Sequence, residues 1–382
     1  MAKTAKINVK DGDLLASIQE CLQSILRLED ISAVLVPQHL PMKNVVMPTL
    51  VTDPDQLDGV DPLAPVFPMT SAKLVSRLTR KPMGGKVVAV MRSCELRAFI
   101  ELVKLKHGSI DELVVLGIDC MGTYRTNDYL GIVGENGKDT TVKFYKNVLS
   151  GGGTALDGVD LTSTCKACEH PVPTGADINI GLFGVDTNDH LLVQAQTPEG
   201  EELLNSLGLS GAKEPPGRKD AVAALVSERT AFRDKMFEET TEKTNSLDKL
   251  TQYLASCINC YNCRVACPVC YCKECVFVTD VFNHEPSQYL RWANRKGILK
   301  MPTDTVFYHI TRLAHMSTAC IGCGQCSNAC PNDIPVMELF RNVSYGTQKA
   351  FEYEAGRSIE DEPPLSVFRE DELTDVVGIG KT

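Results

Sequence analysis

A cysteine motif that occurs twice constrains what this chain can fold into more than any other feature. Each copy has the spacing C-x2-C-x2-C-x3-C-P, which in proteins ligates [4Fe-4S] clusters. The two-residue gaps let one tight loop direct three thiolates at one cluster, whereas the fourth thiolate, beside the proline, ligates the other cluster. The predicted ligand sets are Cys257, Cys260, Cys263 and Cys330 for the first cluster, and Cys320, Cys323, Cys326 and Cys267 for the second.

Two other uses of these cysteines fit the pattern less well. Zinc sites favour paired C-x2-C knuckles closed as a tetrahedron, without a third cysteine two residues later. Disulfides are expected in secreted chains, whereas residues 1–10 are polar and lack the hydrophobic region of a signal peptide. Because each motif supplies one ligand to the cluster of the other motif, the two clusters must lie close together. We therefore expect this region to move single electrons.

The length, net charge and cysteine content of the chain limit the kinds of partner and environment that we expect. A length of 382 residues predicts two or three domains, and a formal net charge of -10 gives no indication of nucleic-acid or anionic-membrane binding. No apolar run approaches the length of a membrane span. The 16 cysteines, without a secretion signal, indicate metal clusters in a reducing environment. We therefore expect a cytoplasmic protein of anaerobic metabolism, with no nucleic-acid partner.

The first half of the chain alternates between helical and strand patterns, which predicts an α/β domain with a mixed sheet and flanking helices. The proline- and aspartate-rich segment 41–68 is predicted to be an extended connection. The predicted elements are, in chain order, helix 13–28, strand 31–36, helix 71–79, strand 86–91, helix 95–106, strand 113–118, a weaker strand 143–148 and strand 177–185.

Four cysteines of this first half form a second candidate metal site. Cys94 and Cys120 each follow a predicted buried strand, and sites in open α/β sheets are built at that edge. Cys165 and Cys168 form a C-x2-C pair farther along the chain. From the residues alone, these four thiols could hold a third [4Fe-4S] cluster, hold a zinc ion, or be buried structural thiols.

The second half begins after Pro215-Pro216-Gly217, a predicted domain boundary. Helical patterns cover 219–240, 289–296, 304–315 and 334–341, and the long segment between the two motifs predicts an inserted helical part. We therefore expect three regions: an α/β domain over 1–217, a mainly α-helical two-[4Fe-4S] ferredoxin-like domain over 218–350, and an acidic C-terminal arm over 351–382.

Three more cysteines follow the first motif closely. Cys270, Cys272 and Cys275 could form a further cluster or zinc site, with His284 as an outside ligand, or could pack around the clusters. Cys21, within a predicted helix, is more typical of a small core residue. No catalytic residue is predicted, because no general acid–base pair, nucleophile triad or phosphate-binding loop stands out.

The chain resembles a known family, the beta subunits of coenzyme F-420 hydrogenases and dehydrogenases, including iron–sulfur formate dehydrogenase beta subunits. The segments that carry the resemblance are Val-Met-Arg-Ser-Cys-Glu-Leu-Arg-Ala at 90–98, Ile-Asp-Cys-Met-Gly-Thr at 118–123, and Cys-Lys-Ala-Cys at 165–168 before Ala-Asp-Ile at 176–178. The resemblance implies that Cys94, Cys120, Cys165 and Cys168 hold a cluster. The C-terminal part is similar to the helical two-cluster domains of heterodisulfide-reductase and succinate-dehydrogenase type subunits.

The sequence differs from the family where flavin would bind. Members that bind FAD have a glycine-rich stretch before an N-terminal helix, whereas residues 11–15 here contain one glycine, and Arg92-Ser93 replaces a proline–glycine pattern before the cysteine. Fewer glycines give the pyrophosphate of FAD less access to backbone amides.

Two functions follow from these observations. The first is an electron-transfer subunit that relays single electrons between redox partners, namely a flavoprotein or the catalytic subunit of a hydrogenase or formate dehydrogenase. The alternative is an FAD-containing subunit that exchanges a hydride with a deazaflavin or nicotinamide, because a flavin can split a two-electron hydride into single electrons. A zinc-binding interaction module is the third reading.

Overall fold

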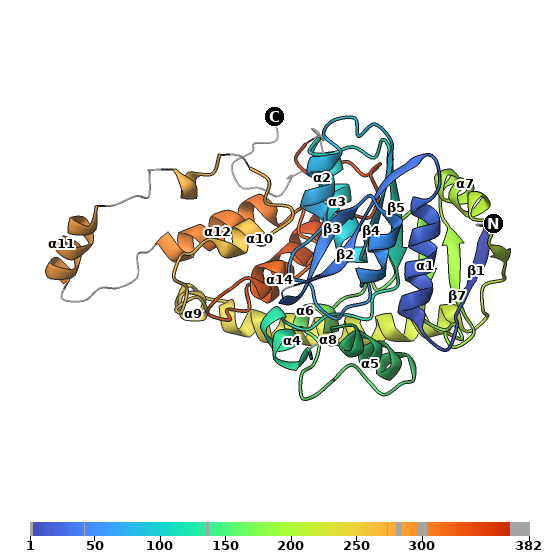
Figure 1. Cartoon of the computed structure of the whole chain (residues 1–382). Coiled ribbons are helices and arrows are strands. Elements are labelled where there is room, and N and C mark those ends of the chain that lie inside the picture. The colour runs from blue at the N-terminus through green and yellow to red at the C-terminus, as the bar shows by residue number, and fades with distance from the viewer. Residues whose placement is uncertain are drawn as a thin grey trace, which may run out of the picture.

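The computed structural model describes residues 3–41, 43–134, 137–272, 274–279, 285–296 and 304–366. A mixed sheet forms the centre of the first part of the chain (Figure 1), with strand order β3-β2-β4-β5-β6-β7-β1-β8. Its strands are β1 (Thr4–Asn8), β2 (Ile31–Leu40), β3 (Lys43–Val51), β4 (Lys86–Met91), β5 (Leu113–Ile118), β6 (Ile178–Gly181), β7 (His190–Ala195) and β8 (Ser210–Gly211).

The central strands β2, β4, β5 and β6 run parallel, and the strands outside them pair antiparallel. The predicted mixed sheet with flanking helices is therefore confirmed. In the ladder between β4 and β5, Met91 lies opposite Gly117, so the two strands end at the same edge of the sheet. Any residue that follows either strand is thereby brought to that edge.

Alternating residues of the strands supply two cores, because successive side chains of a strand point to opposite faces. On one face, Val34 and Val88 pack with α1 (Leu14–Leu26), whose Ile18 and Leu22 are fully buried. On the other face, α2 (Ala72–Leu78) and α3 (Ser93–Lys104) cover the intervening residues, among them Ala89. The sheet is thus the middle layer of three.

The other helices of the described residues complete the fold. They are η1 (Pro54–Gly59), α4 (Thr126–Ile132), α5 (Gly137–Leu149), α6 (Ser163–Lys166), α7 (Pro198–Ser206), α8 (Arg218–Thr244), α9 (Leu247–Tyr253), α10 (Asn262–Ala266), η2 (Val276–Val278), α11 (Pro286–Lys296), α12 (Asp304–Met316), α13 (Gln325–Asn328) and α14 (Val336–Ala350).

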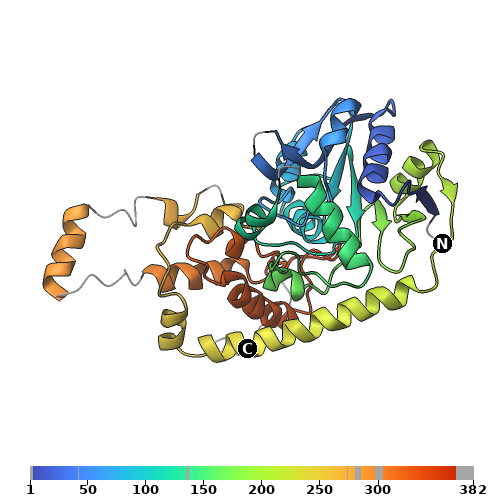
Figure 2. The same ribbon diagram turned by 60° about the horizontal axis from the view of Figure 1, so that its bottom comes forward.

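Helix α8 joins the two parts of the chain. It runs as one straight helix along both the sheet and the C-terminal helices (Figure 2). Arg218, at its first residue, donates two hydrogen bonds to the buried carboxylate of Asp119, at 2.6 and 3.1 Å. Met236 and Phe237, farther along, pack against Met337 of α14. None of the helices in the described residues is long and apolar enough to cross a membrane.

The C-terminal part also shares a core with the sheet. Cys267, Val269 and Met316 pack in the same buried cluster as α2, α3 and the second face of the sheet. The first cysteine motif is therefore held against the α/β region and not on a separate body.

Two predictions of local structure are wrong. Residues 143–148 lie in helix α5, where Thr141, Phe144 and Tyr145 are buried at helical spacing, so the apolar residues follow the helical period of 3.6. Segment 41–68 is not wholly an extended connection, because it contains β3, which pairs antiparallel with β2 as a hairpin.

Candidate iron–sulfur centres

The four thiols predicted for the first cluster line one cavity. It has a volume of about 340 Å³ and is bounded by residues that include Ile258, Tyr308 and His309. Its thiols are those of Cys257, Cys260, Cys263 and Cys330, so the fourth cysteine of the second motif faces the first three of the first motif.

In both motifs the chain turns at two equivalent residues that have positive φ angles. The second and fourth residues after the first cysteine have left-handed backbones: Asn259 and Tyr261 in the first copy, with φ of 51° and 61°, and Gly322 and Gly324 in the second, with φ of 69° and 76°. Glycine adopts this region without a steric cost, whereas Tyr261 is a non-glycine residue in a sparsely populated conformation. The repeated turn gives both loops the curvature that directs their first three thiols to one side.

Helix α12 supplies hydrogen-bond partners to the first thiol set. The Tyr308 hydroxyl lies 3.4 Å from Cys263 Sγ, and His309 Nε2 lies 3.5 Å from Cys257 Sγ. Arg312 Nη1 donates to Cys263 Sγ at 3.1 Å. Burial, followed by the charge of Arg312, lowers the pKa of His309 to about 4, so its imidazole is neutral at neutral pH.

The second thiol set lies next to the first. Burial raises the pKa of Cys267 to about 12, while the charge of Arg312 opposes that rise and the charge of Cys320 adds to it. Cys323 and Cys326 likewise have raised pKa values, from burial first and then from the charge of Cys267. The thiols of this set thus affect one another's pKa values, and Cys326 also packs in the buried cluster that contains Cys263 of the first set.

The four cysteines of the α/β region also line a single cavity. It has a volume of about 580 Å³ and contains the side chains of Cys94, Cys120, Cys165 and Cys168. Cys94 lies in the first turn of α3 and Cys120 follows β5, which places both thiols at the common edge of β4 and β5. Cys165, on α6, accepts a hydrogen bond from the Thr123 amide at 3.3 Å. Cys323, from the second motif, lines the same cavity from the opposite side.

The cavity lined by Cys94, Cys120, Cys165 and Cys168 is called the third cavity below, after the third predicted cluster. Positive side chains surround it: Arg92, Arg97, Arg229 and Arg341. Glu169, one residue after Cys168, accepts from Arg341 and, at 3.1 Å, from Arg233. Burial raises the pKa of Glu169, but the neighbouring Arg341, His170 and Arg233 hold it below its ordinary value. Burial and Arg97 lower the pKa of His170 to about 3, so the histidine is neutral.

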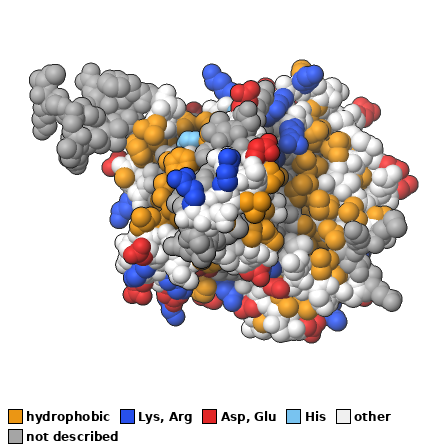
Figure 3. Space-filling model, turned by 90° about the vertical axis from the view of Figure 1, so that its left-hand side faces the viewer, with side chains coloured by type: hydrophobic (Ala, Val, Ile, Leu, Met, Phe, Trp, Pro, Cys, Tyr) orange, Lys and Arg blue, Asp and Glu red, His pale blue; other side chains and the backbone are white. Residues whose placement is uncertain are grey.

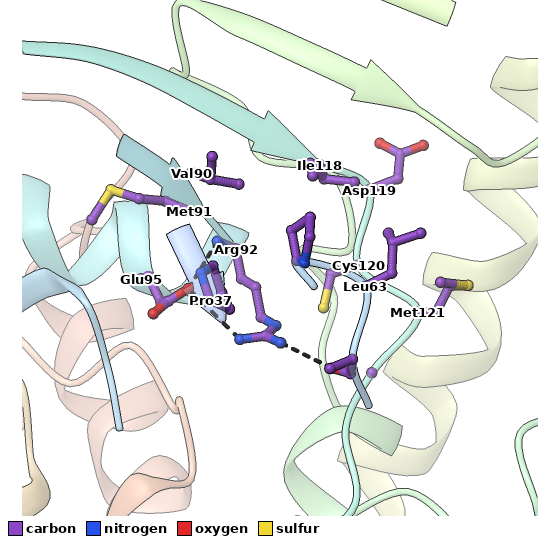
Figure 4. A pocket seen from close by; sticks show the side chains of 13 residues that line it. Pro37, Leu63, Val90, Met91, Arg92, Glu95, Ile118, Asp119, Cys120 and Met121 are labelled. Atoms are coloured by element: carbon purple, nitrogen blue, oxygen red, sulfur yellow. Dashed lines mark hydrogen bonds and ion pairs between the residues drawn. The ribbon is translucent and has the colours of Figure 1, made fainter. Parts of the chain in front are cut away.

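A separate cavity, which is not lined by a complete thiol set, lies beside Cys120 at the edge of the sheet (Figure 4). It has a volume of about 400 Å³ and is lined by the ends of β2, β4 and β5. Arg92 reaches across it, with its guanidinium donating to the carbonyl oxygens of Ala64 and Val66 at 3.0 Å. The turn at Asp11 and Gly12 does not line this cavity, and Asp13 caps α1 with its own carboxylate at 2.9 Å from the Ala16 amide.

The remaining cysteines do not come together. Cys270 packs with the core that contains Cys267, whereas Cys275 packs with Phe277 and Tyr308, and Cys272 is exposed. His284 lies outside the described residues. In the described ranges, no three His, Cys, Asp or Glu side chains converge closely enough to hold one metal ion. A further site at Cys270, Cys272 and Cys275 stays a prediction. Cys21 lies on α1 and packs, half-buried, against the core.

The sequence reasoning missed the groups that surround the thiols. Tyr308, His309 and Arg312 were expected only as parts of a helix. The arginines of the third cavity come from three separate helices, α3 with the residue that caps it, α8 and α14. One signal was available: Tyr308 and Arg312 are four residues apart on a predicted helix, and so share a face. Nothing in the sequence indicated which buried surface that face would meet.

Known proteins include relatives of this chain. Residues 253–334 match the family model of the 4Fe-4S dicluster domain. The F420-dependent formate dehydrogenase subunit beta of Methanocaldococcus jannaschii is 27% identical over 336 residues, which cover 81% of this chain and 83% of that protein. The F420-dependent formate dehydrogenase 1 subunit beta of Methanococcus maripaludis is 25% identical over 315 residues, covering 73% and 75%.

Among solved structures, the chain is similar to one from the F420-reducing [NiFe] hydrogenase complex of Methanosarcina barkeri. The TM-score is 0.45 and the identity 15%, with 65% of this chain and 93% of that chain covered. The sequence matches confirm the predicted resemblance to formate dehydrogenase beta subunits, and the family match confirms a C-terminal region for two [4Fe-4S] clusters.

Proposed function

We propose that this chain, similar over most of its length to beta subunits of F420-dependent formate dehydrogenases, is an iron–sulfur electron-transfer subunit of a multi-subunit oxidoreductase. The observation that carries the proposal is the arrangement of the twelve thiols. One cavity is lined by the four thiols of the first set and another by Cys94, Cys120, Cys165 and Cys168. Of the remaining set, Cys323 borders the second of these cavities and Cys326 packs in the same buried cluster as Cys263. Closely spaced redox centres of this kind form a path for single electrons.

The ligand assignment follows from this arrangement. Cys257, Cys260, Cys263 and Cys330 hold the first cluster, and Cys320, Cys323, Cys326 and Cys267 hold the second. Cys94, Cys120, Cys165 and Cys168 hold a third. When bound, each cluster accepts and releases one electron.

The residues around the thiols fit clusters better than single metal ions. Zinc draws four thiolates into a tetrahedron around one ion, with Zn–S distances of about 2.3 Å. In the part of the chain that the structure describes, by contrast, no three His, Cys, Asp or Glu side chains converge closely enough to hold one metal ion. The arginines around the third cavity would offset the negative charge of four thiolates and their cluster.

The chain itself positions the thiols, shields all but Cys260 at least partly from water, and donates hydrogen bonds to the sulfurs of Cys165 and Cys263. Cys260 is exposed, so the first cluster lies nearest the surface. We propose that a redox partner docks there, as a flavoprotein or as the catalytic subunit of a formate dehydrogenase or hydrogenase. Electron transfer to such a partner needs no catalytic side chain in this chain.

A flavin is the second candidate, supported by the cavity beside Cys120. Ligands of α/β folds bind at the carboxyl ends of parallel strands, where this cavity lies. The helix that would bind the pyrophosphate of FAD is α1, but the carboxylate of Asp13 already caps it and would repel an anion. We therefore favour the relay without flavin, and one bound flavin per chain would reverse that preference.

Cysteine variants of the full-length, anaerobically purified protein test the proposal. Cys165→Ala is expected to lose about four irons, those of one cluster, while Cys263→Ala loses a different cluster with a different low-temperature EPR signal. Cys21→Ala is the matched control, because that thiol belongs to none of the three sets, and its iron content is expected to be unchanged. Full iron content in both of the first two variants would refute the ligand assignment.

A further inference from the structure

Arg312 lies between the two ligand sets of the C-terminal part. The residue is 4% exposed. Its guanidinium donates from Nη1 to Cys263 Sγ at 3.1 Å and from Nη2 to the Cys263 carbonyl at 3.2 Å. Nη2 also lies 3.6 Å from the sulfur of Met316, which packs in the same core as Cys267. One side chain thus reaches from a thiol of the first set toward a thiol of the second.

The surroundings of Arg312 contain thiols and aromatic rings where a buried cation ordinarily has a carboxylate. None of the carboxylates in the described residues forms an ion pair with it, and its guanidinium lies 4.7 Å from the ring centre of Phe340 and 5.7 Å from that of Tyr308. A buried charge needs a compensating charge, or its desolvation is costly. The thiols of Cys263, Cys267 and Cys326 are the nearby groups whose negative charge favours the guanidinium.

One hydrogen-bond donor of Arg312 is unused. Its Nε–H is buried and has no acceptor among the described residues. Buried donors without a partner are rare in proteins, and each asks for an explanation. A cluster held by the adjacent thiols would bring sulfide acceptors to this part of the molecule.

We propose that Arg312 sets the reduction potentials of the two C-terminal clusters together. The inference rests on the proposed function, since it requires that both thiol sets hold clusters. Reduction adds one electron, and so one negative charge, to a cluster. A fixed positive charge and a hydrogen bond to a ligand sulfur both favour that reduced form, which raises the potential. The effect is larger for the first cluster, which Arg312 contacts directly, than for the second, which it reaches through charge alone.

The test is a redox titration of the full-length protein with dithionite as reductant, followed by EPR. Arg312→Met is expected to shift the first cluster at least tenfold toward its oxidised form at a given potential, about 59 mV for a one-electron couple. The second cluster shifts less in the same direction, and the cluster assigned to Cys94, Cys120, Cys165 and Cys168 does not move. Arg357→Met, which removes an exposed charge paired with Asp361, is the control and leaves all potentials unchanged.

A purely structural role for Arg312 would change cluster content or stability without moving the potentials of the retained clusters. If Arg312→Met loses iron, Arg312→Lys and Tyr308→Phe take its place. Arg312→Lys keeps the charge but replaces the two guanidinium nitrogens that contact Cys263 Sγ and its carbonyl by a single ammonium, and Tyr308→Phe removes the hydroxyl 3.4 Å from Cys263 Sγ. Each is expected to lower the potential of the first cluster alone. Unchanged potentials in these iron-replete variants would overturn the inference and leave the relay intact. A wild-type chain without iron would instead overturn the proposed function.

Discussion

Asp119 shows how one side chain can secure both the site and the junction of the two parts of the chain. It precedes Cys120, accepts from the Leu182 amide at 2.9 Å, and pairs with Arg218 at the start of α8. Both members of the pair are buried, so neither charge has water to replace its partner. The carboxylate therefore holds the end of β5, which the proposed ligand Cys120 follows, to the first residue of α8. That helix leads to the proposed ligands of the C-terminal part.

Removing that carboxylate is expected to destabilise the folded protein. Asp119→Ala leaves the buried Arg218 guanidinium with only the half-exposed carboxylate of Glu214, 3.7 Å from its Nε, as a counter-charge. The loss of the buried partner is expected to lower the free energy of unfolding by about 3–5 kcal/mol. Anaerobic urea denaturation followed by circular dichroism measures the change. Asp220→Asn, an exposed position on the same helix, should stay within about 0.5 kcal/mol of the native protein. Equal stability of the two variants would contradict this reading of the pair.

At the scale of single elements, the sequence predicted those whose hydrophobic period is unambiguous. Clear hydrophobic patterns mark α1, β4 and β5, and the sequence located all three elements correctly. Helix α5 was missed because its sequence also alternates over a few residues. Strand β3 was missed because its prolines and aspartate-rich neighbours indicate a loop, whereas pairing with β2 decides its conformation. Tertiary contacts outweighed local propensity in both places.

The segment after α14 is a further element that local sequence did not reveal. Residues 351–382 were expected to be an acidic arm, yet the beginning of the segment is packed against α3. The Tyr353 hydroxyl donates to buried Glu101 at 2.6 Å, and Arg97 donates to the Ala355 carbonyl at 2.6 Å. Since α3 carries Cys94 in its first turn, this contact holds the helix that presents a proposed ligand.

Tyr353→Ala is expected to lower the free energy of unfolding by about 3–5 kcal/mol, the usual cost of removing a large buried aromatic side chain. It also leaves the carboxylate of Glu101 with one fewer donor. Leu365→Ala is the control, since that side chain is 65% exposed and should change stability little. The measurement is the midpoint and slope of chemical unfolding. If both variants unfold at the same denaturant concentration, the segment does not brace α3.

For the whole molecule, residue spacing alone predicted the ferredoxin-type thiol sets, because three ligands of each set lie within one loop. For the third set, the residues alone left a cluster, a zinc ion and buried structural thiols open, and only the family resemblance implied a cluster, because its cysteines come from three separated segments. The fold brings those segments together around one cavity. The packing of the first motif against α2 and α3 was also not predictable, because it depends on contacts between residues far apart in the sequence. The boundary near residue 217 stays a prediction.

The central claim is that three clusters form one path through this chain. Iron and acid-labile sulfide per chain, measured on anaerobically purified protein, test it most directly. Three clusters of four irons predict roughly twelve irons and as many sulfides. Roughly eight irons would contradict the third cluster and leave Cys94, Cys120, Cys165 and Cys168 without the role proposed for them. Zinc in place of iron would contradict the relay itself.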